Sequence, residues 1–339
     1  MKNTRKIRIA INGFGRIGRP TLRVALEKDD LEIVAINDLT EAKVLAHLLK
    51  YDTLYGRYKK KVDYTKDSLI VEGREIKVYA EKEPDKLPWK NLDIDLILES
   101  SGCFTDKKKA SLHLLAGAKR VIISAPPKDQ DIPTYILGVN EESLNPKEKI
   151  ISNGSCTTNC LAPVAKILND EFGIEKCFMT TIHSYTNDQR ILDLAHQDLR
   201  RARAAACNMI PTTTGASQSV VAAIPSLKGK LYGISLRVPT PVVSLIDLVA
   251  QIKKKISVEE VNKVFIKQSQ GKLKNILAVT NEPLVSSDFI GDPHSAIVDL
   301  SFTGVEDNLV KVFAWYDNEW GYANRYVEMA EYLGKIINV

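Results

Sequence analysis

A glycine-rich turn near the N-terminus constrains the fold of this chain more than any other feature. The turn, residues 13–18, reads Gly-Phe-Gly-Arg-Ile-Gly, which has the spacing G-x-G-x-x-G. An alternating, β-rich segment, 7–12, precedes it, helical apolar spacing follows over 17–27, and 31–37 reads as a second strand. A strand, this turn, a helix and a strand within about 30 residues predict a dinucleotide-binding βαβ unit.

The residues of this unit have separate parts in binding a dinucleotide. The three glycines let the backbone approach a pyrophosphate at the start of a helix. Asp38 lies 20 residues after Gly18, at the end of the second predicted strand, where its carboxylate can accept hydrogen bonds from the adenosine ribose. Such a carboxylate repels the 2′-phosphate of NADP, so the sequence favours NAD. A glycine turn in some other α/β fold is the alternative interpretation.

The pattern of predicted elements changes near residue 150. Before it, strands and helices alternate, which is typical of a parallel sheet with helices on its faces. After it, longer strands with fewer helices predict an antiparallel sheet in an α+β domain. We expect an α/β chain with a Rossmann NAD-binding domain over 1–154 plus a C-terminal helix 320–339, and a catalytic domain over 155–319. The other expected elements are strands at 95–99 and 120–125, a helix at 107–116, an antiparallel insertion at 53–80, strands at 177–184, 231–238, 242–251 and 309–316, and a helix at 322–337.

Composition excludes several classes of protein. The net charge of +5 is small for 339 residues and no nucleic-acid motif is present, so a dedicated nucleic-acid site is not expected. No stretch reaches the roughly 18 apolar residues that cross a membrane. Five unevenly spaced cysteines without a secretory segment indicate free thiols in a cytoplasmic protein. The spacing of Cys156 and Cys160 lacks a second pair of ligands, so no metal site is expected.

Cys156 is the candidate nucleophile. It follows small polar residues at the start of a predicted helix that contains Pro163, and there the helix dipole would lower the pKa of its thiol. A thiolate nucleophile needs a base or a cation nearby. His183 ends a predicted strand and opens a polar loop, so it is the candidate partner, and a structural histidine is the competing interpretation. For Cys156, the competing interpretation is a buried structural cysteine.

Six blocks of the sequence carry a family resemblance. They are INGFGRIGR at 11–19, SCTTNC at 155–160, HSYT at 183–186, TTTGA at 212–216, RVPTP at 237–241 and WYDNE at 315–319. On these blocks the chain resembles the phosphorylating glyceraldehyde-3-phosphate dehydrogenases over essentially its whole length. The resemblance implies that Cys156 forms a hemithioacetal with the aldehyde and that His183 assists proton removal and stabilises the oxyanion. It further implies that hydride passes to NAD, that inorganic phosphate releases the thioester as an acyl phosphate, and that the enzyme is a homotetramer.

The resemblance also assigns binding residues for the cofactor and for two phosphate groups. Hydroxyls, amides and guanidinium groups suit phosphate oxygens, which agrees with the assignment of the anion sites. The implied cofactor residues are Gly13, Gly15, Arg16, Ile17, Gly18, Asp38, Lys82, Ser124 and Asn318. The implied anion residues are Thr186 and Arg237 for the substrate phosphate, Ser155, Thr157, Thr214 and Gly215 for the attacking phosphate, and Arg201, associated with phosphate binding.

A few positions depart from the usual family pattern. Gly154 stands where the family usually has Ala, and Val242 stands where it usually has Asn. Val242 keeps erythrose 4-phosphate beside glyceraldehyde 3-phosphate as a candidate aldehyde. Ala195 replaces the Pro of NAD-specific members, while Leu194 beside it is the NAD-type residue, so weak use of NADP is compatible with the sequence. The alternative functions are an erythrose-4-phosphate dehydrogenase, in which the thioester is hydrolysed, and a non-catalytic NAD-binding thiol sensor.

Overall fold

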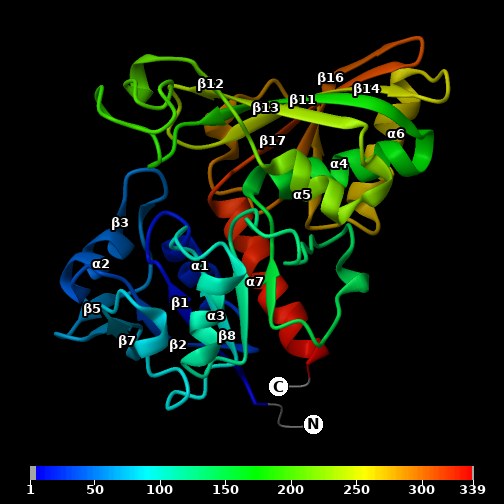
Figure 1. Cartoon of the computed structure of the whole chain (residues 1–339). Helices are drawn as coiled ribbons and strands as arrows, with labels where there is room; N and C mark the ends of the chain where they lie inside the picture. The colour runs from blue at the N-terminus through cyan, green and yellow to red at the C-terminus, as the bar shows by residue number, and fades with distance from the viewer. Residues whose placement is uncertain (1–4, 338–339) are drawn as a thin grey trace. The chain divides into compact units, whose positions relative to one another are not determined.

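The chain divides into two compact units (Figure 1). A computed structural model describes residues 5–337, so the ends of the expected N-terminal domain, 1–4 and 338–339, lie outside the described residues. No helix within the described part is long and apolar enough to span a membrane. The units are Met1–Tyr135 with Glu142–Gly154 and Ala323–Val339, and Ile136–Glu141 with Ser155–Tyr322.

The first unit is built on an eight-stranded sheet. Its strands are β1 (Ile7–Asn12), β2 (Leu31–Asn37), β5 (Val62–Tyr64), β6 (Ser68–Val71), β7 (Arg74–Tyr79), β8 (Leu96–Glu99), β9 (Arg120–Ile123) and β10 (Ile150–Ser152). They lie in the order β10-β9-β8-β1-β2-β7-β6-β5, and all pairs from β10 to β7 are parallel. The central strands are runs of Ile, Leu and Val buried on both faces, as a sheet covered by helices on both sides requires. The insertion pairs antiparallel through β5, β6 and β7, and β7 joins β2 in parallel.

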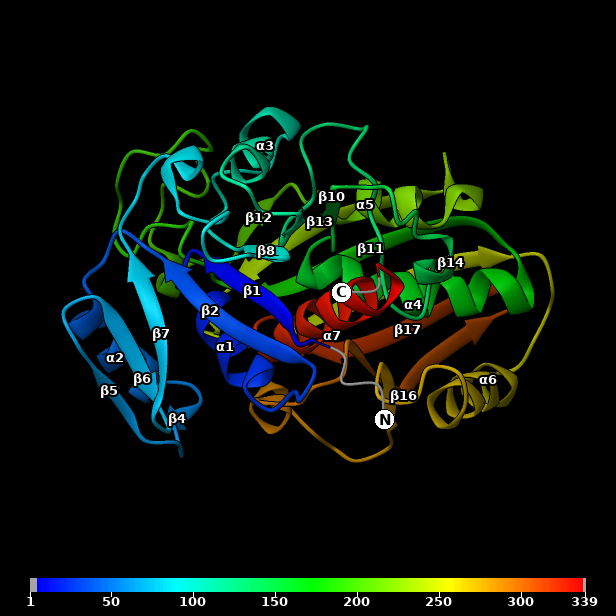
Figure 2. The same ribbon diagram turned by 90° about the horizontal axis from the view of Figure 1, so that it is seen from below.

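Three helices accompany this sheet. They are α1 (Gly18–Ala25), α2 (Ala42–Lys50) and α3 (Lys107–Leu115), and β3 (Tyr51–Asp52) and β4 (Gly56–Arg57) form a small separate hairpin. Figure 2 shows α1 and α3 on opposite sides of the layer formed by β1 and β2. The predicted helices next to the glycine turn and at 107–116 are confirmed, and α2 was not predicted although every third or fourth residue of it is buried.

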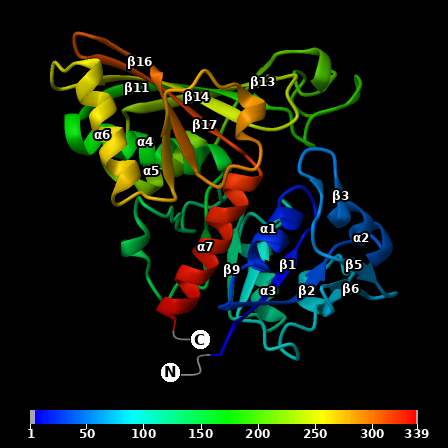
Figure 3. The same ribbon diagram turned by 180° about the vertical axis from the view of Figure 1, so that it is seen from behind.

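The second unit contains a seven-stranded sheet. Its strands are β11 (Ile174–Ser184), β12 (Ile210–Thr212), β13 (Leu231–Val238), β14 (Ser244–Ile252), β15 (Leu277–Thr280), β16 (Ala296–Glu306) and β17 (Leu309–Tyr316). They lie in the order β12-β13-β11-β14-β17-β16-β15, and β11 with β13 and β15 with β16 are the parallel pairs in an otherwise antiparallel sheet. The helices α4 (Cys156–Phe172) and α5 (Ala216–Ala223) cover one face, and α6 (Val258–Gln270) packs on β15 and β16 (Figures 1 and 3).

The expected fold class is confirmed, and three strands are shorter than predicted: β8 begins at Leu96, β9 ends at Ile123, and β14 begins late. The segment 242–251 begins as a strand only at Ser244, because Val243 adopts a left-handed backbone with φ 68° and so ends the preceding turn rather than starting the strand. The C-terminal helix, α7 (Trp320–Ile336), begins at the start of the segment 320–339 assigned to the first domain, two residues before the helical spacing at 322–337. Short 3-10 helices occur at Pro84–Lys86, Glu141–Ser143, Ala205–Cys207, Pro225–Leu227 and Ser286–Phe289.

Candidate active site

The candidate nucleophile, Cys156, is the first residue of α4. Ser155 is the N-cap: its Oγ accepts the N–H of Thr158 at 3.1 Å, and the Thr158 hydroxyl accepts the N–H of Ser155 at 3.1 Å. This reciprocal capping box fixes the backbone on either side of the cysteine. Gly154, which departs from the family pattern, has φ 64°, a conformation that glycine adopts without strain. The predicted helix is confirmed, and it continues through Pro163.

The candidate partner, His183, lies near the end of β11 and is almost completely buried. Its Nε2 is 3.5 Å from the Sγ of Cys156. On the other side of the ring, Nδ1 is 2.7 Å from the carbonyl oxygen of Ser184. The ring also packs edge-on against Tyr316, with 6.0 Å between the ring centres. The structure therefore brings the cysteine and the histidine that were singled out in the sequence into direct contact.

Arg237, in β13, completes this contact. Its Nη1 lies 2.6 Å from Nδ1 of His183 and 3.2 Å from the carbonyl oxygen of Ser184. A guanidinium only donates, so Arg237 favours an Nδ1 that accepts, whereas the carbonyl oxygen of Ser184 favours an Nδ1 that donates, and the two contacts therefore favour opposite tautomers of the ring. The Nε atom of Arg237 is buried and has no hydrogen-bond partner among the described residues. The guanidinium thus keeps a donor available for an anion.

Burial is the main cause of the pKa shifts of Cys156 and His183. It raises the pKa of the Cys156 thiol, and the charge of Arg237 and the hydrogen bonds of Thr157 offset this only in part. Burial, followed by the charge of Arg237, lowers the pKa of His183 to about 3. The expectation that helix position lowers the pKa of Cys156 is therefore wrong, because desolvation of the thiolate outweighs the charges that favour it. The resting pair is a neutral thiol beside a neutral imidazole.

The remaining anion residues lie on three segments of the second unit. Arg201 donates to the Thr212 hydroxyl at 2.9 Å and forms an ion pair with Asp188. These contacts direct its guanidinium to Thr212 and Asp188 rather than to His183 or Arg237. Thr186 follows β11, and its N–H donates to the side-chain oxygen of Gln189 at 3.2 Å. Gly215 is the N-cap of α5, and the hydroxyl of Thr214 accepts the N–H of the first residue of that helix at 3.2 Å.

Tyr316 contacts the candidate site, although the sequence did not single it out. Its hydroxyl contacts the hydroxyl of Thr157 at 2.9 Å and that of Thr181 at 2.8 Å, and all three side chains are buried. Because its ring also packs against His183, Tyr316 connects the first turn of α4 to the candidate histidine. The only signal in the sequence was its place in the block WYDNE, which was used for the neighbouring Asn318.

Asn318 is oriented by two serines of the second unit. Its Oδ1 accepts the hydroxyl of Ser184 and the hydroxyl of Ser244, each at 3.0 Å. With Oδ1 held by the two hydroxyls, the amide nitrogen of Asn318 points the other way. A fixed amide of this kind suits recognition of another carboxamide, such as that of nicotinamide. The serines were not predicted as site residues.

In the first unit, the structure allows a dinucleotide to approach the glycine turn. A Cβ on Gly13, which has φ 90°, would lie 2.5 Å from the backbone nitrogen of Ser101, and one on Gly18 would lie 2.1 Å from the carbonyl oxygen of Gly13. A Cβ on Gly15 would meet nothing within 4 Å, so this glycine leaves open space. Gly13 and Gly18 thus close the turn while Gly15 opens it, as dinucleotide binding requires. The residues present fit NAD.

The other implied cofactor residues of this unit follow strands of its sheet. Asp38 comes directly after β2, and its carboxylate accepts the N–H of Phe14 at 2.8 Å and that of Thr40 at 3.0 Å. Ser124 follows β9 and Lys82 lies three residues after β7. All of them therefore lie at the carboxyl ends of parallel strands, where open α/β sheets bind their ligands. Arg16 lies within the glycine turn, and its guanidinium forms an ion pair with Asp52 at 2.6 Å. Ile17 is the N-cap residue of α1.

Comparisons with known proteins agree with this geometry. The family model described as glyceraldehyde 3-phosphate dehydrogenase, NAD binding domain, matches residues 7–107, and the C-terminal domain of the same family matches 155–318. A glyceraldehyde-3-phosphate dehydrogenase of Geobacillus stearothermophilus is 54% identical over 96% of this chain and 98% of its own length. One from Bacillus cereus is 55% identical over 96% of this chain and 98% of its own. A chloroplastic one from Chlamydomonas reinhardtii is 53% identical over 98% of this chain and 90% of its own.

Proposed function

The chain belongs to the glyceraldehyde 3-phosphate dehydrogenase family, and from this premise we propose the residues that carry out its reaction. It is an NAD-dependent oxidoreductase that converts glyceraldehyde 3-phosphate and inorganic phosphate to 1,3-bisphosphoglycerate. The observation that carries the assignment of catalytic residues is the 3.5 Å contact between Cys156 Sγ and His183 Nε2 at the start of α4.

Cys156 and His183 act together on the aldehyde. The sulfur bonds to the aldehyde carbon while the thiol proton passes through His183 Nε2 to the aldehyde oxygen, which gives a hemithioacetal on Cys156. Bound NAD supplies the hydride acceptor. As the hydride leaves the same carbon, Nε2 accepts the hydroxyl proton, and a thioester remains on the cysteine. A neutral imidazole is the form that can accept this proton, which agrees with the depressed pKa of His183.

Arg237 links substrate binding to this proton transfer. Nε2 accepts a proton only when the ring proton is on Nδ1, donating to the carbonyl oxygen of Ser184 at 2.7 Å. The Nη1 of Arg237, at 2.6 Å from Nδ1, favours the opposite tautomer. A substrate phosphate that pairs with Arg237, together with Thr186, would draw the guanidinium away from the ring. His183 would then become a base only when the phosphorylated substrate is present.

Phosphate attack on the thioester completes the reaction. An oxygen of inorganic phosphate bonds to the carbonyl carbon, the carbon–sulfur bond breaks, and the thiol of Cys156 recovers its proton from the imidazolium of His183. Two helix N-termini supply the donors for this phosphate, that of α4 and that of α5. The residues that we assign to it are Ser155, Thr157, Thr214 and Gly215, and we assign Arg201 to phosphate binding near the loop 184–207.

Four finer assignments remain proposals. We propose glyceraldehyde 3-phosphate over erythrose 4-phosphate as substrate, because Val242 is only 1% exposed and so offers little surface to an aldehyde. We propose a preference for NAD over NADP on the charge of Asp38. A homotetramer is supported by the exposed apolar residues Ile191, Leu192 and Leu199 in the loop 184–207. A reducing, cytoplasmic location is supported by five free cysteines. The domain assignment is that of the sequence analysis, 1–154 with 320–339 and 155–319.

The test measures NADH formation from glyceraldehyde 3-phosphate with and without inorganic phosphate. We expect sustained turnover only with phosphate, and a loss of several orders of magnitude in Cys156→Ser. The matched control is Cys160→Ser, one turn further along α4, where the thiol is buried in the core and donates to the carbonyl oxygen of Ala314 at 3.8 Å. Turnover that does not need phosphate would instead support the hydrolytic erythrose-4-phosphate enzyme. NAD binding without any NADH formation would support the thiol sensor.

A further inference from the structure

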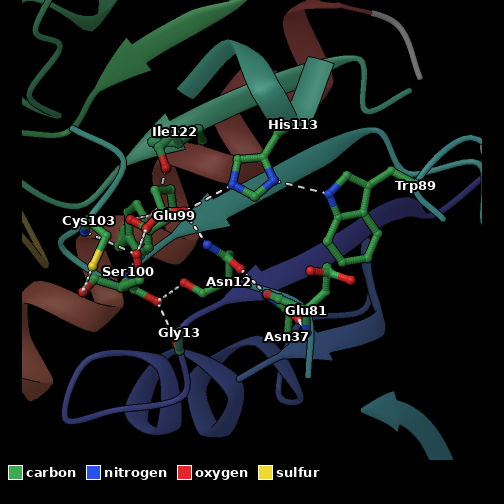
Figure 4. A network of polar contacts seen from close by, with 12 residues as sticks. Asn12, Gly13, Asn37, Glu81, Trp89, Glu99, Ser100, Cys103, His113 and Ile122 are labelled. Atoms are coloured by element: carbon green, nitrogen blue, oxygen red, sulfur yellow. Dashed lines mark hydrogen bonds and ion pairs between the residues drawn. The ribbon is translucent and has the colours of Figure 1, made fainter. Parts of the chain in front are cut away.

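A buried carboxylate, Glu99, lies at the carboxyl end of β8 in the first unit (Figure 4). Its side chain is 1% exposed, and no Lys or Arg of residues 5–337 forms an ion pair with it. Its Oε1 accepts the N–H of Ser101 at 2.8 Å and the hydroxyl of the same residue. Its Oε2 is 2.5 Å from the amide nitrogen of Asn12 and 3.1 Å from Nε2 of His113. The reaction proposed above does not use this group.

The hydrogen bonds of His113 identify its tautomer. The indole nitrogen of Trp89 lies 3.1 Å from Nδ1 of His113, and an indole N–H only donates. Nδ1 is therefore an acceptor, and the ring proton is on Nε2, where it is donated to Glu99. His113 is fully buried. Every partner of Glu99 is thus a donor, and the carboxylate accepts four hydrogen bonds, which is its full capacity.

A chain of amide contacts continues from Glu99 across the sheet (Figure 4). The Oδ1 of Asn12 accepts the amide N–H of Asn37 at 2.7 Å. Asn37 in turn exchanges hydrogen bonds with the backbone of Glu81, each at 2.9 Å. Glu99, Asn12 and Asn37 are the last residues of β8, β1 and β2, and Glu81 lies two residues after β7. The contacts therefore join the carboxyl ends of four neighbouring strands.

This chain of contacts borders the cofactor residues on each strand. Asn12 precedes Gly13, and Asn37 precedes Asp38. Ser101, held by both its N–H and its hydroxyl on Glu99, packs directly against Gly13, and the hydroxyl of Ser100 donates to the carbonyl oxygen of Gly13 at 2.8 Å. Glu99 therefore holds the glycine turn and the turn after β8 together, and through two asparagines it connects them to the residue that precedes Asp38.

We propose that Glu99 is a positioning residue for NAD: its carboxylate sets the spacing between the glycine turn, the turn at residues 100–101 and Asp38. This inference rests on the proposed cofactor residues. The carboxylate is required because an amide cannot replace it. In Glu99→Gln, the side-chain NH2 group faces hydrogen-bond donors whichever way the amide is turned. In one orientation it faces the N–H and hydroxyl of Ser101, and in the other it faces Asn12 and His113. One contact must open, and a buried donor loses its acceptor.

The experiment compares two buried carboxylates at opposite ends of β8 in the full-length enzyme. Asp95 precedes the strand, is fully buried, and accepts the N–H of Arg8 at 2.9 Å and the ammonium of Lys119 at 2.7 Å. The dissociation constant of NAD is measured by calorimetry for wild type, Glu99→Gln and Asp95→Asn, together with the melting temperature and the KM for NAD and for the aldehyde. The calorimetry does not depend on turnover.

We expect Glu99→Gln to raise the dissociation constant and the KM of NAD at least about tenfold, the factor that corresponds to about 1.4 kcal/mol. The KM for the aldehyde should be unchanged. Asp95→Asn should lower the melting temperature without changing NAD affinity. An unchanged affinity in Glu99→Gln, or an equal loss of affinity in both variants, would overturn the inference.

A milder variant covers a failure of Glu99→Gln to fold. Ser101→Ala removes one of the four donors and leaves the backbone contact, so we expect a smaller, measurable loss of NAD affinity with a near-normal melting temperature. No loss of affinity there would overturn the inference. Wild-type enzyme that binds no NAD would refute the proposed cofactor site itself, and the inference with it, and so is distinguishable from a failure confined to the Glu99 variants.

Discussion

The neutral state of His183 predicts how the stability of the enzyme depends on pH. The folded protein holds the pKa of His183 at about 3, whereas the ordinary value, 6.5, applies to the unfolded chain. Between these values the unfolded chain binds a proton that the folded protein does not, so this group makes unfolding more favourable as pH falls. Above about pH 6.5 the difference vanishes. At pH 5 the imidazole should reduce stability by about 2 kcal/mol relative to pH 8.

The assay is urea unfolding of wild type and His183→Asn between pH 5 and 8, at one protein concentration. Asparagine does not titrate, so its profile lacks the contribution of residue 183, while all other groups contribute to both profiles. We expect the difference in unfolding free energy between the two proteins to change by about 2 kcal/mol across this range, in the direction that wild type loses more on acidification.

Two results decide this prediction. His47→Asn is the matched control for the loss of an imidazole, because His47 is exposed in the folded protein. Parallel profiles for wild type and His183→Asn would refute the reasoning. They would mean that the folded protein binds a proton at His183 as readily as the unfolded chain does.

Two further predictions use matched pairs within the chain. Gly13→Ala should destabilise the protein by about 2–4 kcal/mol, because residue 13 has a positive φ and an added Cβ would overlap with Ser101. Gly15→Ala should keep near-normal stability and still weaken NAD binding. Equal urea midpoints for the two variants would contradict this. Ser155→Ala removes the capping box of α4, and Ser257→Ala removes that of α6, so each variant should lose about 1 kcal/mol of stability. Only Ser155→Ala should raise the KM for inorganic phosphate. A similar KM in both variants would show that Ser155 does not bind this phosphate.

Local signals in the sequence were sufficient for the cofactor unit. The strand at 7–12, the glycine turn, α1 and the strand at 31–37 follow one another within about 30 residues, and their periodicity and spacing need no distant contact. The same holds for the position of Cys156, since the small polar residues before it and the helix after it are adjacent in sequence. The structure reproduces both strands with the predicted bounds.

Contacts between distant segments were beyond the reach of these signals. The Tyr316 hydroxyl contacts Thr157 and Thr181, which are 159 and 135 residues away, and neither pair follows any periodic pattern. The direction of the pKa shift of Cys156 also depends on distant segments, because its main cause is burial, which the whole unit creates. At Val243, two β-branched residues in a row favour a strand, and the left-handed backbone that ends the turn is visible only in the structure.

The two buried histidines show why function could not be read from residue type and burial alone. His113 and His183 each contact a donor at Nδ1, 3.1 Å from the indole of Trp89 and 2.6 Å from the guanidinium of Arg237. The indole is fully buried and only donates, so its hydrogen bond to Nδ1 keeps the ring proton of His113 on Nε2 and suits a structural role. The guanidinium is a cation with a buried, unpartnered Nε, and a substrate phosphate competes with the imidazole for it. We therefore expect the tautomer of His183 to change when a phosphorylated substrate binds, whereas that of His113 should stay the same.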